Sequence, residues 1–262
     1  MKKHLLPHIL IISFVFLSVS TAQVVSYAGE PVIIDRYKQA VRKNPDDAYA
    51  HFSLGGAYYI SGMQKEAIEA YKQAIRINPD YAEAYSNLGV VYNYLGMNKK
   101  AIESCKQAIR IDPDFVEAHC NLGTAYITSG KHEKAIAACK RAIGIDPDYA
   151  EAYVNLGCAY TDSGKHKKAI AAYKQAIKIN PNEVEAHYNL GYAYSKSGKA
   201  KKAIKAFKQA IRINPNHARS HYGLGAAYLG SNARKHALEQ YRILKSLDTG
   251  LANQLIYFIN KY

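Results

Sequence analysis

Residues 67–79 of the chain read AIEAYKQAIRINP, residues 169–181 read AIAAYKQAIKINP and residues 203–215 read AIKAFKQAIRINP. Each phrase ends in a proline, and prolines recur every 34 residues, at Pro45, Pro79, Pro113, Pro147, Pro181 and Pro215. A fixed period between about 20 and 50 residues is typical of a repeat array. The pattern therefore predicts one elongated array with a long repeated surface, and function is sought on that surface before any single pocket.

Each repeat predicts two amphipathic helices joined by a short turn. In residues 82–115, apolar side chains recur at helical spacing through the first half and again through the second half, where they are Ala101, Ile102, Cys105, Ala108 and Ile109. Gly96 lies between the halves, at a turn that needs a residue tolerant of positive φ. Pro113 ends the second helix, because proline cannot continue an α-helix.

The start of each first helix carries a capping signal. Asp114 precedes Glu117 by three residues, which is the spacing of a capping box. The same spacing recurs in Asp80/Glu83, Asp148/Glu151 and Asn182/Glu185. We therefore expect these side chains to satisfy free backbone amides at the start of the first helix in four repeats.

Together these positions resemble the tetratricopeptide repeat. The shared features are an aromatic residue or histidine at position 4, Leu-Gly at 7 and 8, tyrosine at 11, glycine at 15, alanine at 20 and 27, and proline at 32. Six units match, at residues 48–81, 82–115, 116–149, 150–183, 184–217 and 218–251. The resemblance implies an all-α, right-handed superhelical solenoid of helix pairs with a concave groove.

The two ends of the array depart from this pattern. Residues 23–47 hold a leader and a half repeat, in which VIIDRYKQAVRKNP (residues 32–45) matches a second helix without its partner. The last unit has Asn232 in place of the glycine, Leu244 in place of the second alanine and Thr249 in place of the proline. Residues 252–262 are expected to form a C-terminal capping helix, because a terminal repeat has one face without a neighbour.

The first 22 residues differ in composition from the repeats. A basic start at Lys2 and Lys3 precedes the apolar run Ile9–Val19, and Ser20-Thr21-Ala22 then supplies small residues suited to cleavage. This order is typical of a secretory signal peptide, so we expect an exported protein, periplasmic or secreted. The alternative is an uncleaved inner-membrane anchor formed by residues 5–28, which approach the length that spans a bilayer.

By the resemblance, positions 2, 5, 6, 9, 12 and 13 of each first helix line the groove. At position 6 an asparagine recurs inside Asn-Leu-Gly, and the column comprises Asn87, Asn121, Asn155 and Asn189. An asparagine amide offers a donor and an acceptor, so such a column can pair with a peptide backbone whatever its side chains are. The repeats resemble those of O-linked N-acetylglucosamine transferase, in which a ladder of this kind serves that purpose. The alternative is local hydrogen bonding within the array.

Asparagines alone would hold a peptide weakly. A net hydrogen bond contributes about 0.5–1.5 kcal/mol, whereas association costs roughly 4–15 kcal/mol. Aromatic side chains on the same stripe would have to supply apolar anchors, and these are Tyr49, Phe52, Tyr59, Tyr94, Tyr188, Tyr192 and Tyr222.

A second groove column, at position 2, comprises Glu83, Glu117, Glu151 and Glu185. Capping and the field at a helix N-terminus explain it, although it would also favour a basic ligand. Tetratricopeptide repeats that clamp the carboxylate tails of chaperones resemble each other in carrying lysine at such positions. That class of partner is therefore not expected.

The formal net charge is +14, and lysine and arginine gather in the second helices and in the turns before them. By the resemblance these residues lie on the convex face and one edge, where a basic surface can attract an anionic partner. Nucleic acid is not expected, because an exported protein rarely meets it and because the groove aromatics lie on the other face. The alternative is a solvated surface with cations near helix C-termini.

Four cysteines are too few for a disulfide scaffold, and neither CxxC nor CxxCH spacing occurs. Cys105 and Cys139 fall at packing positions. Cys120 and Cys158 fall on the groove stripe of adjacent units, where a disulfide is an alternative to free thiols. No nucleophile elbow, phosphate loop or zinc spacing stands apart from the repeat, so we expect no catalysis, no cofactor and no metal.

The sequence predicts an exported scaffold for protein–protein interaction. It would hold an extended peptide or a partner helix in its groove during envelope assembly or secretion. The alternative is a structural scaffold that forms homo-oligomers when a terminal helix docks into the groove of a second copy.

Overall fold

A computed structural model of the chain describes residues 30–261. The predicted signal segment, residues 1–22, and the alternative anchor, residues 5–28, lie outside these residues. The described part contains helices and no strand, so the predicted all-α solenoid is confirmed. The helices are α1 (Glu30–Lys43), α2 (Ala48–Ile60), α3 (Gln64–Ile77), α4 (Ala82–Tyr94), α5 (Asn98–Ile111), α6 (Val116–Thr128), α7 (His132–Ile145), α8 (Ala150–Asp162), α9 (His166–Ile179), α10 (Val184–Lys196), α11 (Ala200–Ile213), α12 (Ala218–Leu229), α13 (Arg234–Leu247) and α14 (Thr249–Lys261).

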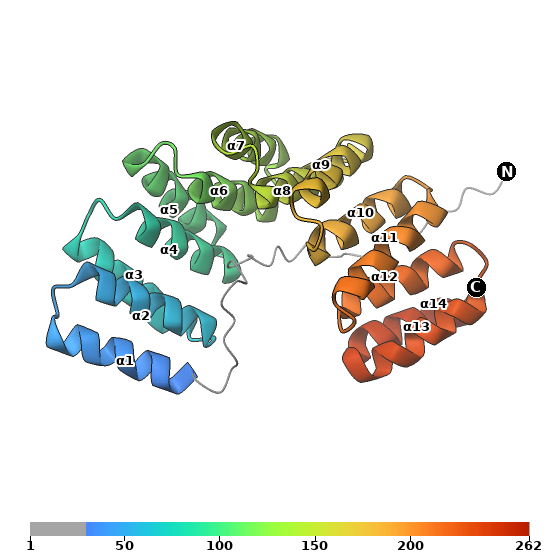
Figure 1. The fold of residues 1–262 in the computed structure, drawn as a ribbon, viewed down its shortest axis with the longest axis horizontal. Coiled ribbons are helices and arrows are strands. Elements are labelled where there is room, and N and C mark those ends of the chain that lie inside the picture. Colours follow the sequence, from blue (N-terminus) through green and yellow to red (C-terminus); the bar gives the residue numbers. More distant parts are fainter. Residues whose placement is uncertain (1–29, 262) are drawn as a thin grey trace.

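The helices stack in pairs along an arc (Figure 1). We name α2, α4, α6, α8, α10 and α12 the A helices, and α3, α5, α7, α9, α11 and α13 the B helices. Each A helix packs on its own B helix and on the next A helix, whereas no Cα atoms of successive B helices lie within 8 Å of each other in the described residues. The A helices therefore lie on the tighter, inner side of the arc and the B helices splay on its outer side.

Close approach within each pair depends on glycine at position 8. A β-carbon built on Gly191 would lie 2.7 Å from a ring carbon of Phe207, and one on Gly89 would lie 2.7 Å from the Cys105 sulfur. Alanine at positions 20 and 27 is fully buried in the same interface, as Ala101 and Ala108 show. Small residues thus let a large or soft side chain at position 24 fill the space between the two helices.

The turns within each repeat need a left-handed backbone. Gly62, Gly96, Gly130, Gly164 and Gly198 have φ between 69° and 74°. In the last repeat Asn232 takes the same conformation, with φ of 61°. Asparagine tolerates this region better than other residues that carry a side chain, so the degenerate repeat keeps its turn.

The predicted capping boxes are wrong. The N-caps of α4, α6, α8 and α10 are Tyr81, Phe115, Tyr149 and Glu183, and none of their side chains caps a helix amide. Asp80 lies one residue before its N-cap, and its backbone N–H donates to Asn78 Oδ1 at 3.1 Å. The residue before the proline therefore closes an Asx turn after each of the first five repeats, through Asn78, Asp112, Asp146, Asn180 and Asn214. Among the described A helices, α2 alone has a side-chain N-cap, which is Asp47.

Histidine at position 4 also belongs to these connections. The Nε2 atoms of His51, His119, His187 and His221 lie 2.8–2.9 Å from the carbonyl oxygens of Pro45, Pro113, Pro181 and Pro215. Because a carbonyl only accepts, Nε2 carries the proton. These histidines fasten the turn to the following A helix.

Two further helices cover the ends of the stack. At one end, α1 packs on α2 through Ile34, which forms a small core with Leu54 and Ala57. At the other end, α14 packs on α12 and α13 and buries Ala252, Leu255 and Ile259. Leu255 lies against Gly225 and fills the space that the position 24 side chain fills in the preceding repeats.

Candidate functional site on the A helices

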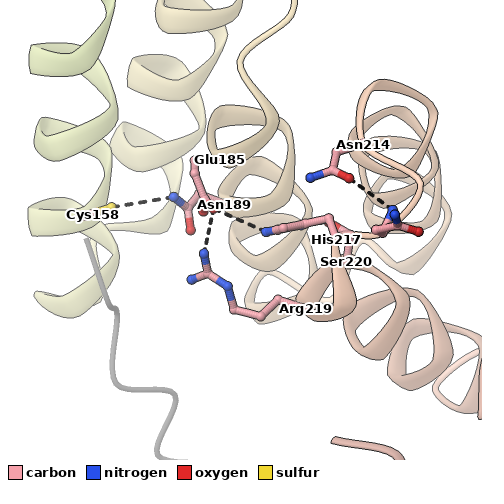
Figure 2. Close-up of polar contacts among 8 residues, drawn as sticks. Cys158, Glu185, Asn189, Asn214, His217, Arg219 and Ser220 are labelled. Atoms are coloured by element: carbon pink, nitrogen blue, oxygen red, sulfur yellow. Dashed lines mark hydrogen bonds and ion pairs between the residues drawn. The ribbon is translucent and has the colours of Figure 1, made fainter. Parts of the chain in front are cut away.

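The asparagine column follows the line along which neighbouring A helices meet. Asn121 Nδ2 donates to Ser86 Oγ at 3.0 Å, and Asn155 Nδ2 donates to Thr124 Oγ1 at 3.0 Å and lies 3.1 Å from Cys120 Sγ. Asn189 Nδ2 lies 3.7 Å from Cys158 Sγ (Figure 2). The amide donors of these three residues therefore bridge adjacent repeats, as the alternative interpretation expected.

The four asparagines differ in exposure. Asn155 is only 1% exposed, and its Oδ1 has no hydrogen-bond partner within the described residues. Asn87, Asn121 and Asn189 are half-buried. Asn87 hydrogen-bonds the Tyr71 side chain, which opposes the rise that burial causes in the pKa of that tyrosine. A ligand on the A helices can therefore reach three of the four carboxamides of the column, whereas its neighbours cover Asn155.

The predicted aromatic anchors separate into two groups. Tyr49 and Tyr94 are 66% and 54% exposed, and Phe52, Tyr59 and Tyr192 are half-buried. Tyr188 and Tyr222 are buried in the packing between repeats. Burial raises the pKa of Tyr222 to about 12, so its hydroxyl remains protonated at neutral pH. The latter two residues stabilise the array and are poorly placed to contact a ligand.

The accessible aromatic residues gather on the first two A helices. The ring centroids of Tyr49 and Phe52 are 6.5 Å apart, and Phe52 lies 5.0 Å from the Tyr81 ring. Tyr59 and Tyr94 meet edge to face at 6.3 Å across α2 and α4. We name Tyr49, Phe52, Tyr59, Tyr81 and Tyr94 the aromatic cluster. It offers apolar ring faces at both ends of α2, which are suited to hold aromatic or aliphatic side chains.

At the other end of the A helices, α10 and α12 are joined by a polar network that the sequence did not predict (Figure 2). Arg219 Nη2 on α12 donates to Glu185 Oε1 on α10 at 2.6 Å, and His217 Nε2 lies 3.2 Å from the same oxygen. The Arg219 guanidinium also lies over the Tyr188 ring, 5.2 Å from its centroid. The available signal was Arg219 itself, because it places a cation where the preceding repeats carry glutamate.

The glutamate column differs from repeat to repeat, and the cysteines are buried. Glu83 and Glu117 are exposed, and Glu151 accepts a hydrogen bond from the Tyr149 hydroxyl at 3.3 Å. All four cysteines are free and buried, so the disulfide alternative for Cys120 and Cys158 is not realised. Within residues 30–261, no three His, Cys, Asp or Glu side chains are grouped so that they could hold a metal ion.

Comparison with known proteins agrees with this geometry. Residues 19–252 match the family model described as the cilia and flagella-associated protein 70 C-terminal domain, a model of tetratricopeptide repeats. The chain belongs to this tetratricopeptide repeat family. No curated protein matches the chain.

Solved structures of tetratricopeptide repeat proteins are similar to this one. MamA is 35% identical, with 63% of this chain and 97% of MamA covered and a TM-score of 0.53. The anaphase-promoting complex assembly Cut9–Hcn1 shares 18% identity over 88% of this chain, with a TM-score of 0.77, and this chain covers 46% of that one. YrrB, described as having an unusual peptide-binding site, is 22% identical over 71% of this chain and 96% of its own, with a TM-score of 0.51.

Within the described part of the chain, no helix combines the length and the apolar character needed to cross a membrane. The predicted signal peptide and its alternative as an anchor fall on residues outside that part, so both stay predictions.

Proposed function

We propose that this tetratricopeptide repeat chain is an exported interaction scaffold that binds an extended peptide or a partner helix along its A helices. Binding would serve assembly of an envelope structure or a secretion machine. The aromatic cluster on α2 and α4 is the main anchoring site. Export rests on the order of basic, apolar and small residues in the first 22 positions.

The exposure of Tyr49 and Tyr94 carries this proposal. Elsewhere on the same stripe, position 5 side chains such as Cys120 and Tyr188 are buried between repeats. Tyr49 lies beside the half-buried Phe52 at the start of α2, and Tyr94 lies beside the half-buried Tyr59 at the end of α2, so apolar ring surface is exposed at both ends of this helix. Burying the exposed ring surface of these tyrosines against a ligand contributes about 25 cal/mol per Å² of apolar area. This free energy adds to the contribution of the asparagines.

In this proposal the asparagine column accepts hydrogen bonds from a peptide but does not donate to it. Its Nδ2 donors are engaged between repeats, so the carboxamide oxygens of Asn121 and Asn189 are the groups that a peptide N–H would meet. Each such bond would contribute about 0.5–1.5 kcal/mol. These contacts would align an extended segment after the aromatic cluster has anchored it.

The similar proteins support the class of partner. YrrB is described as having a peptide-binding site, and the likeness to it is one of fold. In this chain, the surface formed by the A helices has aromatic anchors at one end and the Glu185–Arg219 pair at the other. We infer a ligand whose apolar anchors face α2 and α4 and whose polar portion lies toward α12.

A peptide array gives the test. Fifteen-residue peptides would be screened on the full chain, and the tightest binder titrated against Y49A, Y94A and the matched control Y257A. Tyr257 is 60% exposed on α14, away from the aromatic cluster. We expect binding of aromatic or aliphatic peptides that weakens at least tenfold in Y94A and is unchanged in Y257A. Equal affinity for all variants would contradict the proposal.

Self-assembly into homo-oligomers is the second candidate. It is favoured by exposed apolar side chains on both terminal helices, namely Ile33 on α1 at 44% exposure and Tyr257 on α14. Sedimentation of the full chain at increasing concentration separates the two candidates. A monomer at every concentration would exclude self-assembly and leave the peptide proposal intact.

A further inference from the structure

The two edges of the stack carry opposite charge. Turns of three or four residues join antiparallel neighbours, so every A-to-B turn lies at one edge and every B-to-A turn at the other. We name as the A–B edge the residues 60–68, 94–102, 128–136, 162–170, 196–204 and 230–238. The B–A edge comprises residues 76–83, 110–117, 144–151, 178–185 and 212–219.

The A–B edge is strongly basic. It holds fourteen lysines and arginines against three acidic residues, Glu66, Glu133 and Asp162. All fourteen cations are exposed: Lys65, Lys99, Lys100, Lys131, Lys134, Lys165, Lys167, Lys168, Lys196, Lys199, Lys201, Lys202, Arg234 and Lys235. One of the acidic residues, Glu133, is already paired with Lys165.

The B–A edge has the opposite sign, with five basic against ten acidic residues. The molecule is therefore polarised across its width. A charged surface would orient it with the A–B edge facing an anion and the B–A edge facing away.

Exposed aliphatic side chains interrupt the basic edge only in its first two repeats. Ile60 is 58% exposed, Leu95 is 40% exposed and Met97 is 43% exposed. At the matching positions of the next repeat the chain has Thr128, Ser129 and Lys131. The phosphates of a nucleic acid offer nothing to such side chains, whereas the headgroup region of a bilayer accepts them.

The chain enters the stack at the same place. Helix α1 runs antiparallel to α2, and Ile34 shares a small core with Ala57 near the end of α2, so the start of α1 lies toward the end of α2 (Figure 1). The first described helix therefore begins at the A–B edge, where Ile60 at the end of α2 is exposed.

We propose that the A–B edge docks on the surface of an anionic phospholipid bilayer, with Ile60, Leu95 and Met97 entering the headgroup region and the lysines facing lipid phosphates. In this orientation the A–B edge faces the bilayer and the B–A edge faces away from it. The inference does not rest on the peptide proposal, because the side chains that it uses are Ile60, Leu95, Met97 and the lysines, although Tyr94 of the aromatic cluster borders this edge.

The test uses the full chain on phosphatidylcholine vesicles with and without phosphatidylglycerol. A polarity-sensitive label is placed at L95C or, on the opposite edge, at N182C, while the native cysteines are buried. Lipid-borne nitroxide should quench the label at position 95 on anionic vesicles only, and should leave the label at position 182 unquenched. Equal quenching at both positions, or none at position 95, would overturn the proposal.

Charge variants supply the second arm. Reversing Lys99, Lys134, Lys167 and Lys201 to glutamate should weaken the anion-dependent docking at least about 100-fold, because each cation near an anionic leaflet contributes to binding. Reversing Lys72, Lys106, Lys140 and Lys174 on the B helices changes net charge equally and should have a much smaller effect. Circular dichroism checks that both variants fold. Equal loss in both sets, docking that is insensitive to salt, or displacement by a short DNA duplex in preference to lipid would refute the assignment.

Discussion

Glycine at position 8 sets how closely the two helices of a repeat approach. We expect Gly191→Ala to destabilise the array by about 1–3 kcal/mol, because the new β-carbon would meet the buried ring of Phe207. Gly144→Ala is the matched control, because nothing lies near that position on α7. It should be neutral or stabilising by up to about 1 kcal/mol. Urea unfolding of both variants decides, and equal stability would contradict the packing described.

The cysteines offer a second prediction at this scale. Burial raises the pKa of Cys105 and Cys158 to about 12, so neither thiol forms thiolate at pH 8. A thiol reagent should label none of the four cysteines of the folded chain within minutes, and all four after denaturation. Rapid labelling of Cys120 or Cys158 in the native protein would show that the A helices separate.

The same shifts predict how stability depends on pH. In the unfolded chain the thiols ionise near 9.0, whereas in the folded chain Cys105 and Cys158 ionise near 12. Folding therefore favours the protonated thiols. Their contribution to the free energy of unfolding is fully present below pH 9 and is lost as the pH rises toward 12. The unfolding midpoint should fall over this range, and less steeply in Cys105→Ala. If Cys105→Ala leaves the pH dependence of the unfolding midpoint unchanged, burial of the Cys105 thiol does not raise its pKa as described.

At the scale of the element, two substitutions test whether an aspartate side chain caps the A helix that follows it. Asp47 Oδ1 accepts from the amides of Tyr49 and Ala50, so Asp47→Ala should cost about 0.5–2 kcal/mol. Asp80→Ala should be within about 0.5 kcal/mol of the parent, because the Asp80 side chain caps no helix. If Asp80→Ala were as costly as Asp47→Ala, a capping box would be present after all. Thermal unfolding of both variants measures this difference.

The helices were largely predictable from the sequence, whereas the hydrogen bonds in the connections between repeats were not. The 34-residue period, the glycine at each turn and the apolar face of α14 all follow from local patterns. The capping box failed because α4 begins one residue later than predicted, with Tyr81 as its N-cap, and because the Asx turn uses the side chain of Asn78, two residues before Asp80. Spacing in sequence cannot decide between two hydrogen-bond partners that lie so close along the chain.

The candidate site was predictable only in outline. The predicted stripe on the A helices includes exposed and half-buried side chains, yet Tyr188, Tyr222 and Asn155 are buried. Neighbouring A helices meet along part of this stripe, and the side chains in the contact are covered. How far each A helix rotates against the next is a property of packing across repeats, which a single repeat does not encode.

On the scale of the whole molecule, stability is close to a sum over neighbours. Leu255 on α14 is fully buried against Gly225, so Leu255→Ala should cost about 2–5 kcal/mol. The loss should be confined to the last repeats, since α12 and α13 are the only described helices that α14 contacts. Hydrogen exchange should therefore increase in α12–α14 and remain unchanged in α4–α8. A uniform increase would indicate a single cooperative unit.

The central claim is that the aromatic cluster on α2 and α4 anchors a peptide. A photo-reactive phenylalanine analogue placed at position 94, or at position 257 as the control, tests it directly with the tightest array peptide. We predict cross-linking from position 94 that excess free peptide abolishes, and none from position 257. Equal cross-linking from both positions, or from position 257 alone, would contradict the account.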